Sequence, residues 1–188
     1  KKIKNFFFPI FKYKDYFLYK AKIKKNLIID KQLKFLLSTS GSLGEPKCVK
    51  LSFENIKNNS NAIDKYLKIN KLDRTITTLP WNYSYGLSII NTHLNKGASL
   101  VVTKKTLFDK EFWELYDKSK ITNFNGVPFT FEILKKIKLE RLFNSKIRFI
   151  TQAGGKMNSI LSNEIIKLCI KNKILFYSMY GQTEASPR

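Results

Sequence analysis

From about residue 33 onward, the sequence alternates between short runs rich in β-branched and apolar residues and amphipathic stretches with helical periodicity. The strand-like runs are 34–38, 47–52, 75–79, 98–103, 121–125, 147–151 and 174–180. The helix-like stretches are 53–67, 84–94, 110–118, 128–137 and 159–170. Strands that alternate with helices of about this length imply βαβ crossovers. We therefore expect an α/β fold with a mainly parallel sheet and flanking helices.

Residues 1–32 lack this alternation. Aromatic residues and lysines alternate loosely between Phe6 and Tyr19, which fits either a pair of strands or a helix. The apolar stretch 6–11 ends at Lys12 and is too short for a signal-peptide core, and the chain has no apolar run long enough to predict a transmembrane segment. We expect a lead-in of uncertain structure over 1–32 and the main domain over 33–188.

Cysteine and histidine usage indicates neither a metal site nor a catalytic triad. Cys48 and Cys169 lie far apart without metal-type spacing or a disulfide framework, so we expect a reducing, cytoplasmic location. His93 is the only histidine, and we predict that it is structural.

The net charge of +21 comes mainly from lysine, because only four of the 35 basic residues are arginine. Proteins that read nucleic acids favour arginine, whose planar fork matches phosphates and guanine edges. The lysines here are spread along the whole chain, so we interpret them as a solvated surface. Loose attraction to polyanions at low salt is the alternative, and we expect no specific nucleic-acid partner.

The segment 38–47 reads Ser-Thr-Ser-Gly-Ser-Leu-Gly-Glu-Pro-Lys and lies between two predicted strands. Glycines let backbone N–H groups approach an anion, hydroxyls donate hydrogen bonds to it, and lysine adds positive charge. Pro46 and Cys48 stand where the common nucleotide loop needs Gly and Ser or Thr, and no G-x-G-x-x-G pattern occurs. We therefore predict a phosphate-binding loop of another kind.

Two motifs resemble those of a known family. The first is Thr39-Ser40-Gly41-Ser42-x-Gly44-x-Pro46-Lys47, and the second is Tyr180-Gly181-Gln182-Thr183-Glu184. Shorter matches lie between them in the family's order, at Leu79-Pro80, Tyr85-Gly86, Gly126-Val127-Pro128 and Ala153-Gly154-Gly155. Because of these motifs, the segment 33–188 resembles the adenylate-forming enzymes. This family includes acyl-CoA synthetases, the adenylation domains of nonribosomal peptide synthesis and luciferases. The resemblance implies that 33–188 is a partial AMP-binding domain.

This resemblance implies an AMP-forming acid ligase. In such an enzyme a carboxylate attacks the α-phosphorus of ATP, giving an acyl-adenylate and pyrophosphate. The acyl group then passes to a thiol, for which coenzyme A or the phosphopantetheine of an acyl carrier protein are the implied acceptors. ATP and Mg²⁺ are the implied cofactors, and a small-molecule carboxylic acid is the implied substrate.

The resemblance also implies roles for individual residues. Lys47 and Thr183 would contact phosphates during catalysis, and Glu184 would ligate Mg²⁺. The implied nucleotide-binding residues are Thr39, Ser40, Gly41, Ser42, Gly44, Lys47, Gly154, Gly155, Tyr180, Gly181, Gln182 and Thr183, with Tyr180 stacked on the adenine. The implied borders of the acyl pocket are Tyr85, Gly86, Gly126 and Val127.

Some positions depart from the family pattern. Leu43 stands where a threonine is usual, and Tyr83 where acyl-CoA synthetases often have histidine. The Phe-Asp pair with which amino-acid-activating domains hold an α-ammonium group is absent near Tyr83, so we expect a substrate other than an amino acid.

The family's ribose-binding aspartate, hinge and C-terminal lysine follow the last motif present here. The resemblance therefore implies that residues 1–188 alone are inactive, although the parent protein would be an enzyme. A truncated or degenerate relative that binds nucleotide or serves as a scaffold without turnover is the alternative, and Leu43 favours it.

Overall fold

The computed structural model describes residues 7–14, 16–21, 28–39, 47–137, 139–143 and 146–185. The chain divides into two units, Lys1–Lys31 and Gln32–Arg188. In the first unit, β1 (Phe7–Tyr13) and β2 (Tyr16–Ala21) form an antiparallel hairpin. Of the two structures that the sequence allowed for this segment, the strand pair is the one observed.

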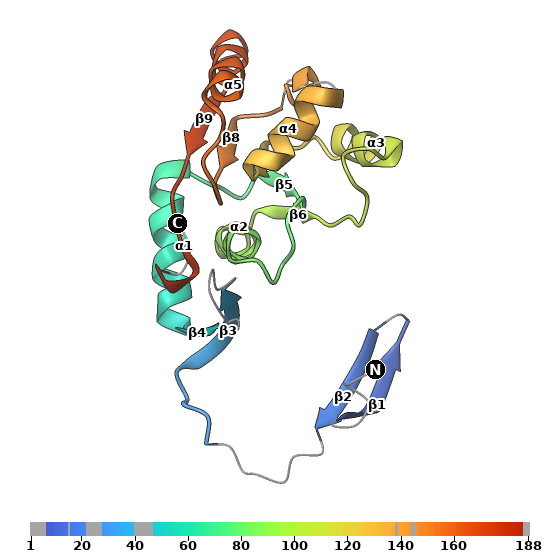
Figure 1. The fold of residues 1–188 in the computed structure, drawn as a ribbon, viewed down its shortest axis with the longest axis vertical. Helices are drawn as coiled ribbons and strands as arrows, with labels where there is room; N and C mark the ends of the chain where they lie inside the picture. The colour runs from blue at the N-terminus through green and yellow to red at the C-terminus, as the bar shows by residue number, and fades with distance from the viewer. Residues whose placement is uncertain are drawn as a thin grey trace. The chain divides into compact units, whose positions relative to one another are not determined.

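The second unit contains a five-stranded sheet with the order β6-β5-β7-β8-β9 (Figure 1). Its strands are β5 (Arg74–Ile76), β6 (Ser99–Val101), β7 (Asn123–Gly126), β8 (Phe149–Gln152) and β9 (Leu175–Ser178). Each neighbouring pair is parallel. The predicted α/β fold is confirmed.

The helices begin and end within one residue of the predicted bounds. They are α1 (Phe53–Leu67), α2 (Ser84–Asn95), α3 (Lys110–Lys118), α4 (Pro128–Ile137) and α5 (Ser159–Lys171). Short 3-10 helices, η2 (Leu139–Leu142) and η3 (Thr183–Ala185), follow α4 and β9. Ser52 caps α1, since its hydroxyl accepts the Asn55 N–H at 3.1 Å while the Asn55 side chain accepts the Ser52 N–H at 2.9 Å.

The strands of the parallel sheet are shorter than predicted. β5 ends at Ile76, although the sequence predicts a strand to residue 79. The Thr77 N–H still donates to the Val101 carbonyl at 3.0 Å, but Thr78 uses its side-chain hydroxyl to reach the Asn125 carbonyl at 2.6 Å. The chain leaves the sheet there, and Pro80 has no N–H to resume the ladder.

Helices cover both faces of the sheet. The apolar side chains of α3, α4 and α5 form one cluster with Ile76, Phe124 and Ile150 of the strands. On the opposite face, α1 packs against Phe149, and α2 joins a smaller cluster around Ala153. This division follows from right-handed crossovers, because α2 leads the chain toward β6 whereas α3, α4 and α5 lead it in the opposite direction across the sheet.

A separate antiparallel hairpin precedes α1. It consists of β3 (Leu33–Thr39) and β4 (Lys47–Ser52), in which Leu37 and Leu51 are buried. The residues that connect the two strands, 40–46, lie outside the described part of the chain. Among the described residues, no helix has both the length and the apolar character needed to cross a membrane.

Candidate functional site

The strand order predicts where a ligand binds. β5 and β7 are neighbours, but the chain leaves β5 through α2 on one face and leaves β7 through α4 on the other. In parallel α/β sheets, ligands bind beyond the carboxyl ends of the strands, at the point where the connections diverge in this way.

A cavity of about 910 Å³ lies at this edge of the sheet. Its walls come from four segments: the end of β3, the turn after β5, the loop after β8 and the residues after β9. The lining residues are Ser38, Thr39, Pro80, Asn82, Tyr83, Ser84, Gly154, Gly155, Lys156, Met179, Tyr180, Gly181, Gln182, Thr183 and Glu184. The cavity thus brings together the start of the first motif, the paired glycines and the whole second motif.

Part of the predicted phosphate loop can be located. Thr39 lines the cavity, and its hydroxyl donates to the Lys47 carbonyl across the hairpin at 3.4 Å. Lys47 is exposed at the start of β4 and does not line the cavity. Ser40, Gly41, Ser42 and Gly44 are predicted site residues that lie outside the described residues.

Gly154 shows why a side chain is not tolerated on one cavity wall. Its φ of +84° lies in the left-handed region, and a Cβ built there would be 2.3 Å from the Tyr83 hydroxyl oxygen and 3.1 Å from Val127 Cγ1. The loop after β8 therefore lies directly against Tyr83.

The predicted acyl-pocket residues form a layer beside the cavity and do not line it. Tyr85 and Gly86 are buried in the first turn of α2, and Gly126 is buried at the end of β7. Val127 packs against the cluster of Tyr85, Ile89 and Ala153. Their role in binding an acyl group stays a prediction.

Tyr180 is 84% exposed, so its ring is available to a ligand. Thr183 and Glu184 follow it in η3, with Glu184 exposed. No group of three or more acidic, histidine or cysteine residues among those described could hold a metal ion by itself. A single carboxylate nevertheless suits Mg²⁺ that is bound mainly through substrate phosphates, because Mg²⁺ keeps several non-protein ligands.

A buried chain of polar side chains connects α2 with β7 and β8, and the sequence patterns above do not predict it. The Tyr85 hydroxyl is 2.7 Å from that of Thr151, which donates to Asn125 Oδ1 at 2.5 Å. The Asn125 amide donates to Asn123 Oδ1 at 3.1 Å, and the Asn123 amide is 3.1 Å from His93 Nε2. All five residues are at most 2% exposed.

The donors and acceptors at the His93 end of this polar chain can be assigned. His93 Nδ1 lies 2.8 Å from the Ile89 carbonyl, which can only accept, so Nδ1 bears the proton and Nε2 accepts from Asn123. The sequence does contain a signal for it, since asparagines at 123 and 125 project from one face of a strand that is otherwise buried.

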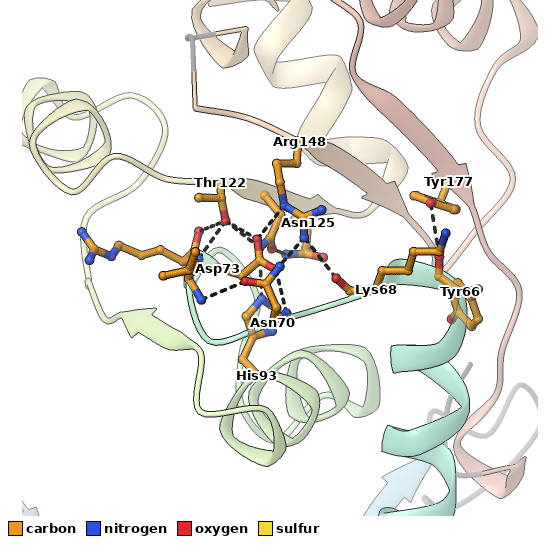
Figure 2. A network of polar contacts seen from close by, with 12 residues as sticks. Tyr66, Lys68, Asn70, Asp73, His93, Thr122, Asn125, Arg148 and Tyr177 are labelled. Carbon is orange, nitrogen blue, oxygen red and sulfur yellow. Dashed lines mark hydrogen bonds and ion pairs between the residues drawn. The ribbon is translucent and has the colours of Figure 1, made fainter.

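The polar chain continues to the opposite edge of the sheet, where the strands begin, because the Asn123 amide also donates to the Thr122 hydroxyl at 3.4 Å (Figure 2). Asp73 is 1% exposed and accepts from Arg148 Nε at 2.9 Å, from the Thr122 hydroxyl at 2.8 Å and from the Asn70 N–H at 2.9 Å. Burial raises the pKa of Asp73, but the hydrogen bonds from Arg148, Asn70 and Thr122 outweigh it and lower the pKa. The cluster around Asp73 joins the starts of β5, β7 and β8, whereas the cavity lies at the carboxyl ends of the strands. We therefore regard this cluster as structural.

The profile of the AMP-binding enzyme family matches residues 18–188. The chain belongs to this family. Acyl-CoA ligase sidI of Aspergillus fumigatus is 28% identical over 154 residues, which are 79% of this chain and 25% of the ligase. Gramicidin S synthase 2 of Brevibacillus brevis is 28% identical over 156 residues, which are 80% of this chain and 3% of the synthase.

Solved structures share this fold. The o-succinylbenzoate coenzyme A synthetase MenE from Bacillus subtilis, in complex with ATP and magnesium ion, superposes with a TM-score of 0.68 and 23% identity. The match covers 81% of this chain and 31% of MenE. The N-terminal domain of FACL13 from Mycobacterium tuberculosis gives a TM-score of 0.68 at 21% identity, over 81% of this chain and 37% of that domain. The chain thus spans well under half the length of these relatives.

Proposed function

We propose that this chain contributes the nucleotide site of an AMP-forming ligase, whose parent protein activates a carboxylic acid with ATP. The observation that carries this proposal is the composition of the cavity. Segments far apart in the sequence, around Thr39, Gly154 and Tyr180, meet there at the carboxyl ends of parallel strands. ATP and Mg²⁺ in complex with MenE support the choice of nucleotide.

The residues of the cavity fit such a ligand. The exposed ring of Tyr180 offers a flat apolar surface for a base, and Gly154 and Gly155 line the same cavity. Thr183 supplies a hydroxyl donor for a phosphate oxygen. Glu184 would hold Mg²⁺ together with the nucleotide's phosphates, and the cation would neutralise charge on the pyrophosphate leaving group.

For the acid and the acceptor we propose the chemical class. Because this chain has no Phe-Asp pair near Tyr83, we propose a carboxylic acid without an α-ammonium group. The acyl-CoA ligases and the peptide synthetase among the relatives favour a thiol acceptor, either coenzyme A or a carrier-protein phosphopantetheine.

Calorimetric titration of this chain with ATP and Mg²⁺ at moderate salt tests the site. Tyr180→Ala and Lys47→Ala should each weaken saturable binding by about tenfold or more, because stacking and a phosphate contact are lost. Phe108→Ala and Lys118→Ala are matched controls, since both residues are exposed and do not line the cavity. Equal binding by all five proteins, or binding that vanishes with salt, would contradict the proposal.

Turnover is tested on the parent protein. Release of pyrophosphate that depends on added carboxylic acid is the expected result. Saturable nucleotide binding without any such release over a broad panel of acids would favour the alternative, a relative that binds nucleotide but no longer catalyses.

A further inference from the structure

Gln152, the last residue of β8, contacts two walls of the cavity without lining it. It is 2% exposed. Its side-chain N–H donates to the Gly155 carbonyl at 2.7 Å, and its Oε1 accepts from the Ser178 hydroxyl at 3.1 Å. Its backbone carbonyl accepts the Met179 N–H at 2.8 Å. One buried residue therefore connects the loop after β8 with the segment after β9.

The orientation of this amide follows from its partners. The Gly155 carbonyl can only accept, so the NH₂ group must face it, which leaves Oε1 for the Ser178 hydroxyl. The bond to the Gly155 carbonyl requires the amide NH₂, whereas the bond from Ser178 requires only an acceptor oxygen. A carboxylate of the same shape would place an oxygen against the Gly155 carbonyl, and an apolar side chain would leave both partners without their bond.

We propose that Gln152 is a positioning residue, which sets the separation between the glycine wall at 154–155 and the wall that bears Tyr180. This inference rests on the proposed function, since these walls are the ones that would enclose the adenosine part of ATP. Thr39, at the end of β3, lies on a third wall and has no hydrogen bond to Gln152 among those of the described residues. Thr183 and Glu184 follow Tyr180 on the same wall, whereas Thr39 lies on another wall, so Gln152 should affect adenosine binding more strongly than phosphate binding.

The test compares wild type with Gln152→Glu and Gln152→Met by calorimetry, with ATP, AMP and inorganic tripolyphosphate as separate ligands. We expect both variants to bind ATP and AMP about tenfold more weakly, and tripolyphosphate at most about threefold more weakly. Ser178→Ala removes one of the two hydrogen bonds of the Gln152 side chain and should weaken the binding of ATP and of AMP by about threefold. Asn172→Ala is the matched control, because that amide also donates to a backbone carbonyl, at 2.8 Å, but at the far end of α5.

Hydrogen exchange without nucleotide separates this inference from the proposed function. In both Gln152 variants, amides of 154–156 and 179–184 should exchange faster, while those of α4 stay unchanged. Unchanged exchange in both walls would overturn the inference. An equal loss of binding for all three ligands, together with a lower unfolding temperature, would also overturn it, because that result indicates a merely structural role. Faster exchange at the walls with no saturable ATP binding by wild type would instead contradict the proposed function alone.

Discussion

At the scale of single residues, the Tyr83 hydroxyl occupies the space that a side chain at position 154 would need. Gly154→Ala adds a Cβ in the left-handed region, 2.3 Å from the Tyr83 hydroxyl oxygen. We expect the free energy of unfolding to fall by about 3 kcal/mol, because backbone strain and steric overlap act together. Urea denaturation of both proteins measures the difference.

Gly97 provides the control for backbone strain. It has a φ of +64°, but a Cβ there would meet nothing within 4 Å. Gly97→Ala should therefore cost only about 1 kcal/mol. The Gly154→Ala penalty should shrink when Tyr83 is also changed to Phe, and an unchanged penalty in that background would refute the proposed contact.

At the scale of elements, the Asp73 cluster joins the starts of three strands. The pKa of Asp73 is lowered in the folded state, so its contribution to stability is complete above the unfolded-state value of about 4 and is lost as the pH falls through the folded value. Asp73→Asn should lower the free energy of unfolding by about 2 kcal/mol at neutral pH, a moderate figure because Arg148 is partly exposed to solvent.

The same substitution should also flatten the acid side of the stability profile. Urea titrations between about pH 2 and pH 7 measure this. Asp117→Asn, on the exposed side of α3, is the control and should keep the wild-type profile. A profile that Asp73→Asn leaves unchanged would mean that this carboxylate does not contribute to acid sensitivity.

The buried polar chain joins α2 to the middle of the sheet. Asn125→Ala removes the acceptor of the Thr151 hydroxyl and the donor to Asn123 in one step. Because both partners stay buried, we expect a loss of about 3 kcal/mol in thermal or urea unfolding. Asn58→Ala, on an exposed position of α1, should change stability by less than about 0.5 kcal/mol. Similar values for the two variants would contradict a continuous chain.

At the scale of the whole molecule, the net charge of +21 is the dominant electrostatic feature. Like charges repel more in the folded than in the expanded state, so the unfolding temperature should rise by several degrees between about 10 and 150 mM NaCl. KCl should give the same rise, because the effect is screening and not specific ion binding. An unfolding temperature that does not depend on salt would show that the lysines are too dispersed to repel one another.

The helices could be predicted from sequence because their determinants are local. The apolar spacing in 53–67, the cap at Ser52 and the proline at 128 involve residues within a few positions of one another. Residues 1–32 allowed two structures, since alternating aromatics and lysines do not distinguish a strand from a helix. The predicted end of β5 is wrong because the Thr78 side chain, and not a backbone N–H, makes the hydrogen bond to Asn125.

The amino-acid sequence by itself determined the α/β class, the order of the elements and the two motifs that identify the AMP-binding family. It did so because propensity, capping and motif spacing depend on neighbours along the chain. Only the tertiary structure decided that Gln152 connects two cavity walls and that Asn125 faces Thr151. Those partners depend on strand order and register, which bring residues far apart in the sequence within hydrogen-bond distance, and no local pattern encodes that placement.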